Sequence, residues 1–264
     1  MDYTLNVHGR LLDLSRPLVM GILNATPDSF YADSRRQTEE DIAACCRKML
    51  AEGAAIIDVG GCSTRPGGEV ASEAEEMKRL RMALEVVRGG QPEAVISVDT
   101  FRPDVARMAV EEFGADIIND VSGGTPEMFR MVTRLHVPYI LMSLQPTMRD
   151  MLLSFAEKVQ QLRDMGANDI ILDPGFGFGK TLEQNYIVMQ NLEVLHELHL
   201  PLLVGVSHKS MIYKLLGTTP DEALNGTTVL HTIALMKGAH ILRAHEVREA
   251  MECIKIVHEC NYEL

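Results

Sequence analysis

Polar side chains end several of the short apolar runs that recur along this chain. Three of them, Asp99, Asn119 and Asp173, present mainly hydrogen-bond acceptors. If they lie together, they suit one of three roles. They could be independent turn formers, ligands of a metal ion, or an acceptor array for a flat heterocycle rich in N–H donors, since one carboxylate can accept two parallel hydrogen bonds. Their spacing leaves all three interpretations open.

Basic side chains follow the last two apolar runs. Lys209 lies in the segment Ser-His-Lys-Ser, residues 207–210, directly before a predicted helix whose first N–H groups favour anions. Arg243 and His245 end the final run. Lys209 alone could be a solvated side chain, but together with Arg243 and His245 it predicts a basic region beside the acidic one.

The segment ILDPGFGFGKT, residues 171–181, looks at first like a phosphate-binding loop. A nucleotide P-loop needs four residues between its first glycine and Gly-Lys-Ser/Thr, because that length wraps successive N–H groups around the phosphates. Here Pro174 stands where the first glycine should be, and proline has no N–H to donate. The segment therefore needs a role other than binding a nucleotide.

The segment CSTRPGG, residues 62–68, combines a hydroxyl group, a guanidinium group and mobile glycines. Arg65 could bind an anion, or it could pair with Glu69 on a solvated surface. The residue types favour the anion.

The elements that must position these residues repeat one pattern eight times. Each apolar run precedes a stretch typical of a helix, and alternating strands and helices predict a parallel sheet. Eight such units favour a closed (β/α)8 TIM barrel over an open doubly wound sheet. The predicted strands are 18–23, 55–60, 94–99, 116–120, 138–143, 169–173, 201–207 and 240–245. Three predicted helix starts carry capping signals: Thr38 with Asp41, Ser72 with Glu75, and Thr125 before Pro126.

Ligands of such barrels bind at the C-terminal ends of the strands, where the polar residues of this chain are expected. The residues at these ends are Asn24, Asp58, Asp99, Asn119, Ser143, Asp173, Ser207, Lys209, Arg243 and His245. Segment 3–14 alternates around Gly9 like a β-hairpin, which could plug the other end of the barrel. We expect residues 1–264 to form a single domain.

Composition limits the classes of partner. The chain is 46% hydrophobic, which indicates a globular protein with a buried core. Its net charge of -12 disfavours binding to nucleic acid or to an anionic membrane. The N-terminus has no targeting pattern and no apolar run is long enough to span a membrane, so a cytoplasmic location is expected. The five cysteines have neither disulfide nor metal-site spacing, which predicts reduced thiols.

Seven motifs together resemble the dihydropteroate synthase family of pterin-binding (β/α)8 enzymes. They are GILNATPDSF (21–30), DVGGCSTRPGG (58–68), SVDT (97–100), INDVSGG (118–124), LDPGFGFGKT (172–181), GVSHKS (205–210) and RAHEV (243–247). The resemblance implies an enzyme of folate synthesis, usually a homodimer. Such an enzyme joins 6-hydroxymethyl-7,8-dihydropterin diphosphate to 4-aminobenzoate and releases pyrophosphate with Mg²⁺ present.

The resemblance also implies roles for individual residues. Asp99, Asn119 and Asp173 would bind the pterin edge. Asn24 would approach Mg²⁺ and the diphosphate. Arg65, Lys209, Arg243 and His245 would act in catalysis, with Arg243 and His245 at the diphosphate and Lys209 near the ring and the aminobenzoate. Thr64, Arg65, Pro66 and Phe178 would shape the pocket for the second substrate, and Ser210 would bind substrate. In segment 171–181 the glycines would permit a close loop, and Thr181 would begin a helix.

Two positions depart from the family pattern. Ser143 stands where the family commonly has histidine, and His208 stands where it commonly has arginine. If His208 faces the site, contact with the diphosphate should weaken. These departures leave a non-catalytic pterin-binding paralogue as an alternative. A pterin-dependent methyltransferase of the same fold is another alternative, although it would have no use for a diphosphate clamp.

Overall fold

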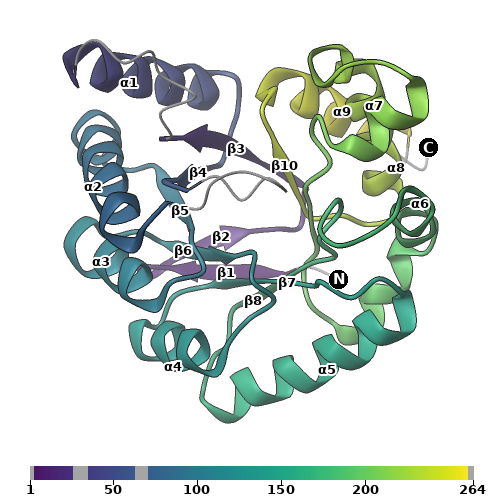
Figure 1. The fold of residues 1–264 in the computed structure, drawn as a ribbon, viewed down its shortest axis with the longest axis horizontal. Helices are drawn as coiled ribbons and strands as arrows, with labels where there is room; N and C mark the ends of the chain where they lie inside the picture. The colour runs from purple at the N-terminus through teal and green to yellow at the C-terminus, as the bar shows by residue number, and fades with distance from the viewer. Residues whose placement is uncertain (1–2, 26–34, 63–70, 261–264) are drawn as a thin grey trace.

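The chain folds as a (β/α)8 barrel, as predicted (Figure 1). The computed structural model describes residues 3–25, 35–62 and 71–260. In this part of the chain eight parallel strands follow the order β8-β7-β6-β5-β4-β3-β10-β9. A parallel bridge between Leu172 and Leu202 brings the two edges of the sheet together. The strands are β3 (Leu18–Asn24), β4 (Ile56–Gly60), β5 (Val95–Asp99), β6 (Ile117–Asp120), β7 (Tyr139–Met142), β8 (Ile170–Asp173), β9 (Leu203–Val204) and β10 (Ile241–Ala244).

Helices surround the strands, and the apolar side chains between the two layers form the main core (Figure 1). The α-helices are α1 (Arg35–Ala51), α2 (Glu73–Gly90), α3 (Pro103–Phe113), α4 (Pro126–Leu135), α5 (Met148–Asp164), α6 (Leu182–Gln190), α7 (Ser210–Leu216), α8 (Leu224–Met236) and α9 (Val247–Cys260). Two 3-10 helices, η2 (Leu192–Leu198) and η3 (Pro220–Glu222), lie between them. None of the described helices is both long and apolar enough to cross a membrane, and all five cysteines are free thiols.

Most of the predicted helix starts are confirmed. Ser72 caps α2 and Thr125 caps α4 through their hydroxyl groups, each accepting an N–H three residues further on. Thr181 begins α6 with a complete capping box. The prediction for Thr38 was wrong, because α1 already begins at Arg35. A local capping signal cannot exclude an earlier start when the residues before it, here Arg-Arg-Gln, are good helix formers.

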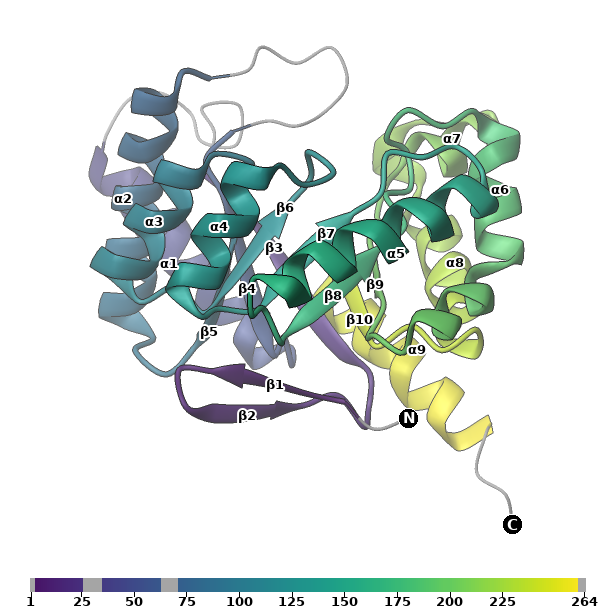
Figure 2. The same ribbon diagram turned by 90° about the horizontal axis from the view of Figure 1, so that it is seen from below.

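The predicted N-terminal hairpin closes one end of the barrel (Figure 2). Strands β1 (Thr4–Val7) and β2 (Arg10–Asp13) pair antiparallel. Leu5, Val7 and Leu14 are buried against the first residues of the barrel strands. This apolar floor contains Met20, Ile56, Ile117, Ile140, Ile171, Leu203 and Ile241. The hairpin and this apolar floor therefore cover one end of the barrel in the part of the chain that the structure describes.

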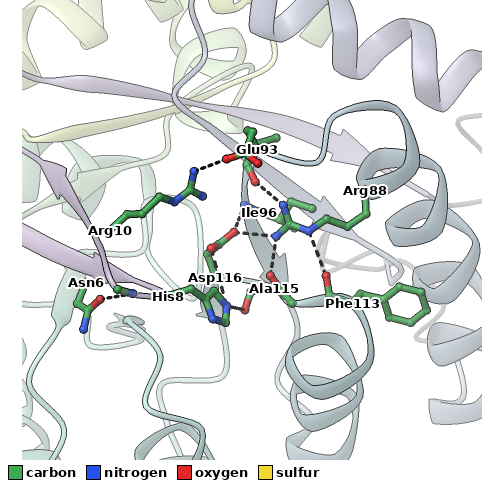
Figure 3. A network of polar contacts seen from close by, with 12 residues as sticks. Asn6, His8, Arg10, Arg88, Glu93, Ile96, Phe113, Ala115 and Asp116 are labelled. Carbon is green, nitrogen blue, oxygen red and sulfur yellow. Dashed lines mark hydrogen bonds and ion pairs between the residues drawn. The ribbon is translucent and has the colours of Figure 1, made fainter.

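A polar network fastens the hairpin to the strands (Figure 3). Asp116 is 1% exposed and accepts hydrogen bonds from the Arg88 guanidinium at 2.9 Å and from the Ile96 N–H at 2.8 Å. His8 of the hairpin contacts the Ala115 carbonyl through its Nε2 at 3.1 Å. Arg10 pairs with Glu93 nearby. This network satisfies a buried carboxylate at the closed end, so it has a structural role there.

Candidate functional site

A layer of polar side chains lies directly above the apolar floor. Side chains two residues apart on a strand point to the same face of the sheet. Asp58, Asn119, Asp173 and Arg243 each stand two residues after a floor residue on their own strand, so they face the barrel interior. A barrel that served only stability would fill this layer with branched apolar residues. The polar layer therefore marks the open end of the barrel as the candidate site.

Arg243 joins two carboxylates at the centre of this layer. Its Nε donates to Asp58 Oδ2 at 2.7 Å, and one terminal nitrogen donates to Asp99 Oδ2 at 2.9 Å. The other contacts of Asp58 come from the Ser97 hydroxyl at 2.6 Å and from the Asn119 amide at 3.1 Å. Asp58 is fully buried, so these donors offset the cost of removing its charge from water.

Two acceptors in this layer have no partner. Asp99 Oδ1 and Asn119 Oδ1 are buried, and neither accepts a hydrogen bond from any part of the chain that the structure describes. Asp99 and Asn119 are direct neighbours across β5 and β6. A buried acceptor without a donor typically costs about 1–3 kcal/mol. Two such atoms on neighbouring residues at the open end fit a ligand that brings N–H donors.

The electrostatics of the layer favour a ligand with donors or positive charge. Burial raises the pKa of Asp99 to about 7, although Arg243 opposes the shift. Burial also raises the pKa of Asp173, against the opposing charge of Lys209. For Arg243 burial disfavours the charge, but Asp58 and Asp99 outweigh that effect and raise its pKa. The three buried carboxylates thus outnumber the two cations, Arg243 and Lys209. A ligand that brings hydrogen-bond donors would stabilise the charged form of a carboxylate.

The raised pKa of Asp99 predicts a pH-dependent stability difference between the wild type and an Asp99→Asn variant. The unfolded chain loses this proton near pH ~3.9, whereas the folded protein holds it to about 7. Between these values the folded state binds the extra proton, so a pH increase removes at most about 1.4 kcal/mol of wild-type stability per unit. Asparagine has no such proton. Urea unfolding of both proteins across this window measures the difference, and a pH-independent difference would contradict the assignment.

The loop after β8 carries the second group of site residues. Gly175, Gly177 and Gly179 all have positive φ, which agrees with the expected close loop. Asp173 Oδ1 accepts the Gly175 N–H at 2.7 Å. Lys209 donates to the Phe176 carbonyl, and its ammonium lies 4.4 Å from the centre of the Phe178 ring. Burial lowers the pKa of Lys209 to about 8, while Asp173 limits the shift.

The basic region lies around the start of α7. The backbone N–H of His245 donates to the Ser207 hydroxyl at 3.3 Å. His208 turns towards Glu246, with its Nε2 3.0 Å from the carboxylate, and its Nδ1 contacts the Pro220 carbonyl. Its ring centre lies 6.1 Å from that of His245. The His208 ring is therefore engaged by protein groups at the edge of the basic region.

Other predicted residues occupy positions around these two groups. The Asn24 amide oxygen and the Asp99 carboxylate both lie beside Gly60, which has no side chain to separate them. Ser210 is the first residue of α7 and follows Lys209. Ser143 is buried, and its hydroxyl accepts the Gln145 N–H at 3.1 Å. Thr64, Arg65 and Pro66 lie outside the described residues.

The polar layer includes Asp58, which the sequence placed at a strand end without a role in the site. Asp58 was grouped with strand ends, but β4 continues to Gly60, so Asp58 stands inside the barrel beneath the mouth. A charged residue within the apolar run AIIDVGG, in phase with Ile56, is the signal that could have identified it. Lys180 was considered only as part of a phosphate loop. It instead donates to three carbonyls of the site loops.

Comparisons with known proteins agree with this geometry. The sequence model of the pterin binding enzyme family matches residues 20–245. Dihydropteroate synthase of Escherichia coli strain K12 is 40% identical over 265 residues, which cover 94% of this chain and 93% of that protein. A structure of Xanthomonas albilineans dihydropteroate synthase with 4-aminobenzoic acid superposes with a TM-score of 0.94 at 33% identity over 100% of both chains. The Clostridium difficile enzyme, solved in the presence of pteroic acid, has a TM-score of 0.89 at 31% identity, with 94% of this chain and 98% of that chain covered.

Proposed function

The chain belongs to the pterin binding enzyme family, and we propose that it catalyses the dihydropteroate synthase reaction. The substrates are 6-hydroxymethyl-7,8-dihydropterin diphosphate and 4-aminobenzoate, and the products are 7,8-dihydropteroate and pyrophosphate. The observation that carries the proposal is the pair of unpartnered acceptors, Asp99 Oδ1 and Asn119 Oδ1, in a buried polar layer. A pterin ring offers N–H donors along one edge, which such acceptors can bind.

The polar layer also suits the chemistry of the reacting carbon. The bond from this carbon to the diphosphate breaks and its electron pair leaves with the diphosphate. The arylamine nitrogen forms the new C–N bond and loses one proton, which passes to the pyrophosphate or to water. Positive charge develops on the electron-rich dihydropterin as the diphosphate leaves. The carboxylates of Asp58, Asp99 and Asp173 can stabilise this charge from fixed positions in a buried site. The step needs no nucleophilic side chain of the protein.

The basic region would receive the leaving group. Arg243, Lys209 and His245 are the basic residues that we assign to this side of the site, as the family resemblance implies. Arg243 is in contact with both Asp58 and Asp99, so it connects the ring pocket to the basic region. Lys209 and Phe178 would border the arylamine pocket, together with Ser210 and with Thr64, Arg65 and Pro66.

A Mg²⁺ ion fits this site if it arrives with the diphosphate. Among the residues that the structure describes, no group of three His, Cys, Asp or Glu side chains could enclose a metal ion. Mg²⁺ commonly binds through one or two protein oxygens together with substrate phosphates. Asn24, whose amide oxygen lies beside Gly60 at the mouth of the barrel, would hold it. The ion would supply neutralising charge to the leaving group.

Product formation tests the proposed function directly. The purified chain is incubated with the pterin diphosphate, 4-aminobenzoate and Mg²⁺, and dihydropteroate is quantified by mass spectrometry together with released pyrophosphate. We expect the two products in equal amounts, and neither when one substrate is omitted. Binding of the pterin without product would instead identify a non-catalytic paralogue.

A homodimer is part of the proposal. Five large apolar side chains are at least half exposed on α7, α8 and α9, which pack against one another (Figure 1). They are Leu215, Leu216, Val229, Met236 and Ile256. Apolar surface of this kind is typical of an interface between subunits. Light scattering should give twice the chain mass of 29.3 kDa, and a monomer at micromolar concentration would contradict the proposal.

A cytoplasmic location stays a prediction, which cell fractionation can test.

A further inference from the structure

Lys180 holds together two loops at the mouth of the barrel. Its ammonium donates to the carbonyl of Ser143 at 3.1 Å, in the loop after β7. It also donates to the carbonyls of Gly175 at 3.0 Å and Phe178 at 3.3 Å, in the loop after β8. An ammonium group has three N–H donors, and here each can meet one acceptor. The contact therefore fixes the position of one loop relative to the other.

Asn185 of α6 supports the opposite edge of the same loop. Its amide oxygen accepts the Gly177 N–H at 2.7 Å. Its amide nitrogen donates to the carbonyl of Thr181 at 2.7 Å and to that of Lys180 at 3.3 Å. At Gly175, a side chain would collide with the Ser143 carbonyl, which shows how closely the two loops approach. Glycine, asparagine and lysine together leave the loop little freedom.

The loop held in this way forms the surroundings of Lys209. The Phe176 carbonyl accepts from the Lys209 ammonium, and the Phe178 ring lies against it. Gly177 also packs against the Lys209 stem. We propose that Lys180 is a positioning residue for the proposed reaction, which ties the loop after β8 to Ser143 and thereby places Phe178 and Lys209 for the arylamine. This inference rests on the proposed function.

The charge of Lys180 also affects Lys209. Burial is the main cause of the lowered pKa of Lys209, and the positive charges of Arg243 and Lys180 add to it. Removing the Lys180 charge should therefore raise the pKa of Lys209. A looser loop would expose Lys209 to water, which acts in the same direction. If Lys180 only stabilised the fold and did not act on Lys209, its replacement would leave the pKa of Lys209 unchanged.

A Lys180→Met variant tests the proposal, with Lys237→Met as the matched control. Lys237 also donates to a backbone carbonyl, that of Gln190 at 2.7 Å, and it pairs with Glu193. For Lys180→Met we expect the KM for 4-aminobenzoate to rise about tenfold, with pterin affinity changed by less than about twofold. We also expect the Lys209 titration, followed by NMR of labelled lysine, to move to higher pH. Lys237→Met should change none of the three.

Two results would overturn the proposal. One is an unchanged KM for the arylamine together with an unchanged Lys209 titration in Lys180→Met. The other is an equal loss of affinity for pterin and arylamine. If Lys180→Met does not fold, Lys180→Arg keeps the charge, but its planar guanidinium cannot meet three converging carbonyls in the same way. It should raise the KM for the arylamine, and a normal KM would contradict the proposal. The NMR titration and the pterin affinity need no turnover, so they separate this inference from a failure of the proposed function.

Discussion

An Arg243→Ala variant is expected to lose about 3–5 kcal/mol of folding free energy, because it leaves buried carboxylates without their counter-charge. Arg243 donates to Asp58 at 2.7 Å and to Asp99 at 2.9 Å, and its side chain is only 20% exposed. The loss should be smaller at low pH, because the raised pKa of Asp99 allows this carboxylate to take up a proton there. Urea unfolding at about pH 8 and about pH 5 measures both effects. If the variant is as stable as the wild type at the higher pH, the ion pairs of Arg243 do not contribute to stability as we expect.

The same variant should bind every pterin ligand more weakly. The resemblance predicted that Arg243 contacts the diphosphate, in which case the pterin diphosphate would lose affinity and the pterin alcohol would not. In the structure Arg243 also orders Asp58 and Asp99, beside the unpartnered acceptors. We therefore expect both ligands to lose affinity, and the diphosphate to lose more. Calorimetric titration of the two ligands separates these contributions, and an unchanged affinity for the alcohol would restrict Arg243 to the diphosphate.

An Asp173→Asn variant is expected to weaken pterin binding by about 2–3 kcal/mol. Asp173 is 7% exposed at the end of β8, and one of its oxygens accepts the Gly175 N–H. An asparagine that keeps this contact would turn its NH₂ group towards the N–H donors of the ring. Two donors would then face each other in a buried site. Calorimetry with the pterin alcohol measures the loss.

Asp120→Asn is the matched control for this variant. Asp120 is a buried carboxylate at the end of β6, but it accepts from the Tyr139 hydroxyl at 2.6 Å and from the Ser122 N–H at 2.7 Å. It stands two residues after Ile118, which packs against the helices, so it faces away from the barrel interior. This control should lose stability and retain pterin affinity. Equal losses of affinity in both variants would remove Asp173 from the ring pocket.

The sequence predicted the elements well, because each strand is an apolar run with clear boundaries. Seven of the eight runs contain the observed strand, β3 continues one residue past its run to Asn24, and the hairpin around Gly9 is confirmed. The grouping of Asp99 with Asn119 followed from strand ends alone, since the ends of parallel strands meet at one edge. The predicted start of α1 at Thr38 was too late, because the good helix formers before it extend the helix to Arg35.

Contacts between side chains of distant strands could not be predicted in the same way. The bond from Arg243 to Asp58 joins residues 185 positions apart. This bond can form only because the sheet brings β10 beside β3, whose other neighbour is β4. The carbonyls of Gly175 and Phe178 that meet Lys180 belong likewise to a loop in which three glycines have positive φ. The sequence supplied these residues but not the distances between them.

A crystal structure of the protein with a bound pterin alcohol tests the central claim most directly. We predict the ring inside the mouth of the barrel, with its N–H donors within hydrogen-bond distance of Asp99 Oδ1, Asn119 Oδ1 and the Asp173 carboxylate. The two acceptors that lack partners in the ligand-free chain would then both be satisfied. A pterin bound elsewhere, or one that leaves both Asp99 Oδ1 and Asn119 Oδ1 without a donor, would contradict the account.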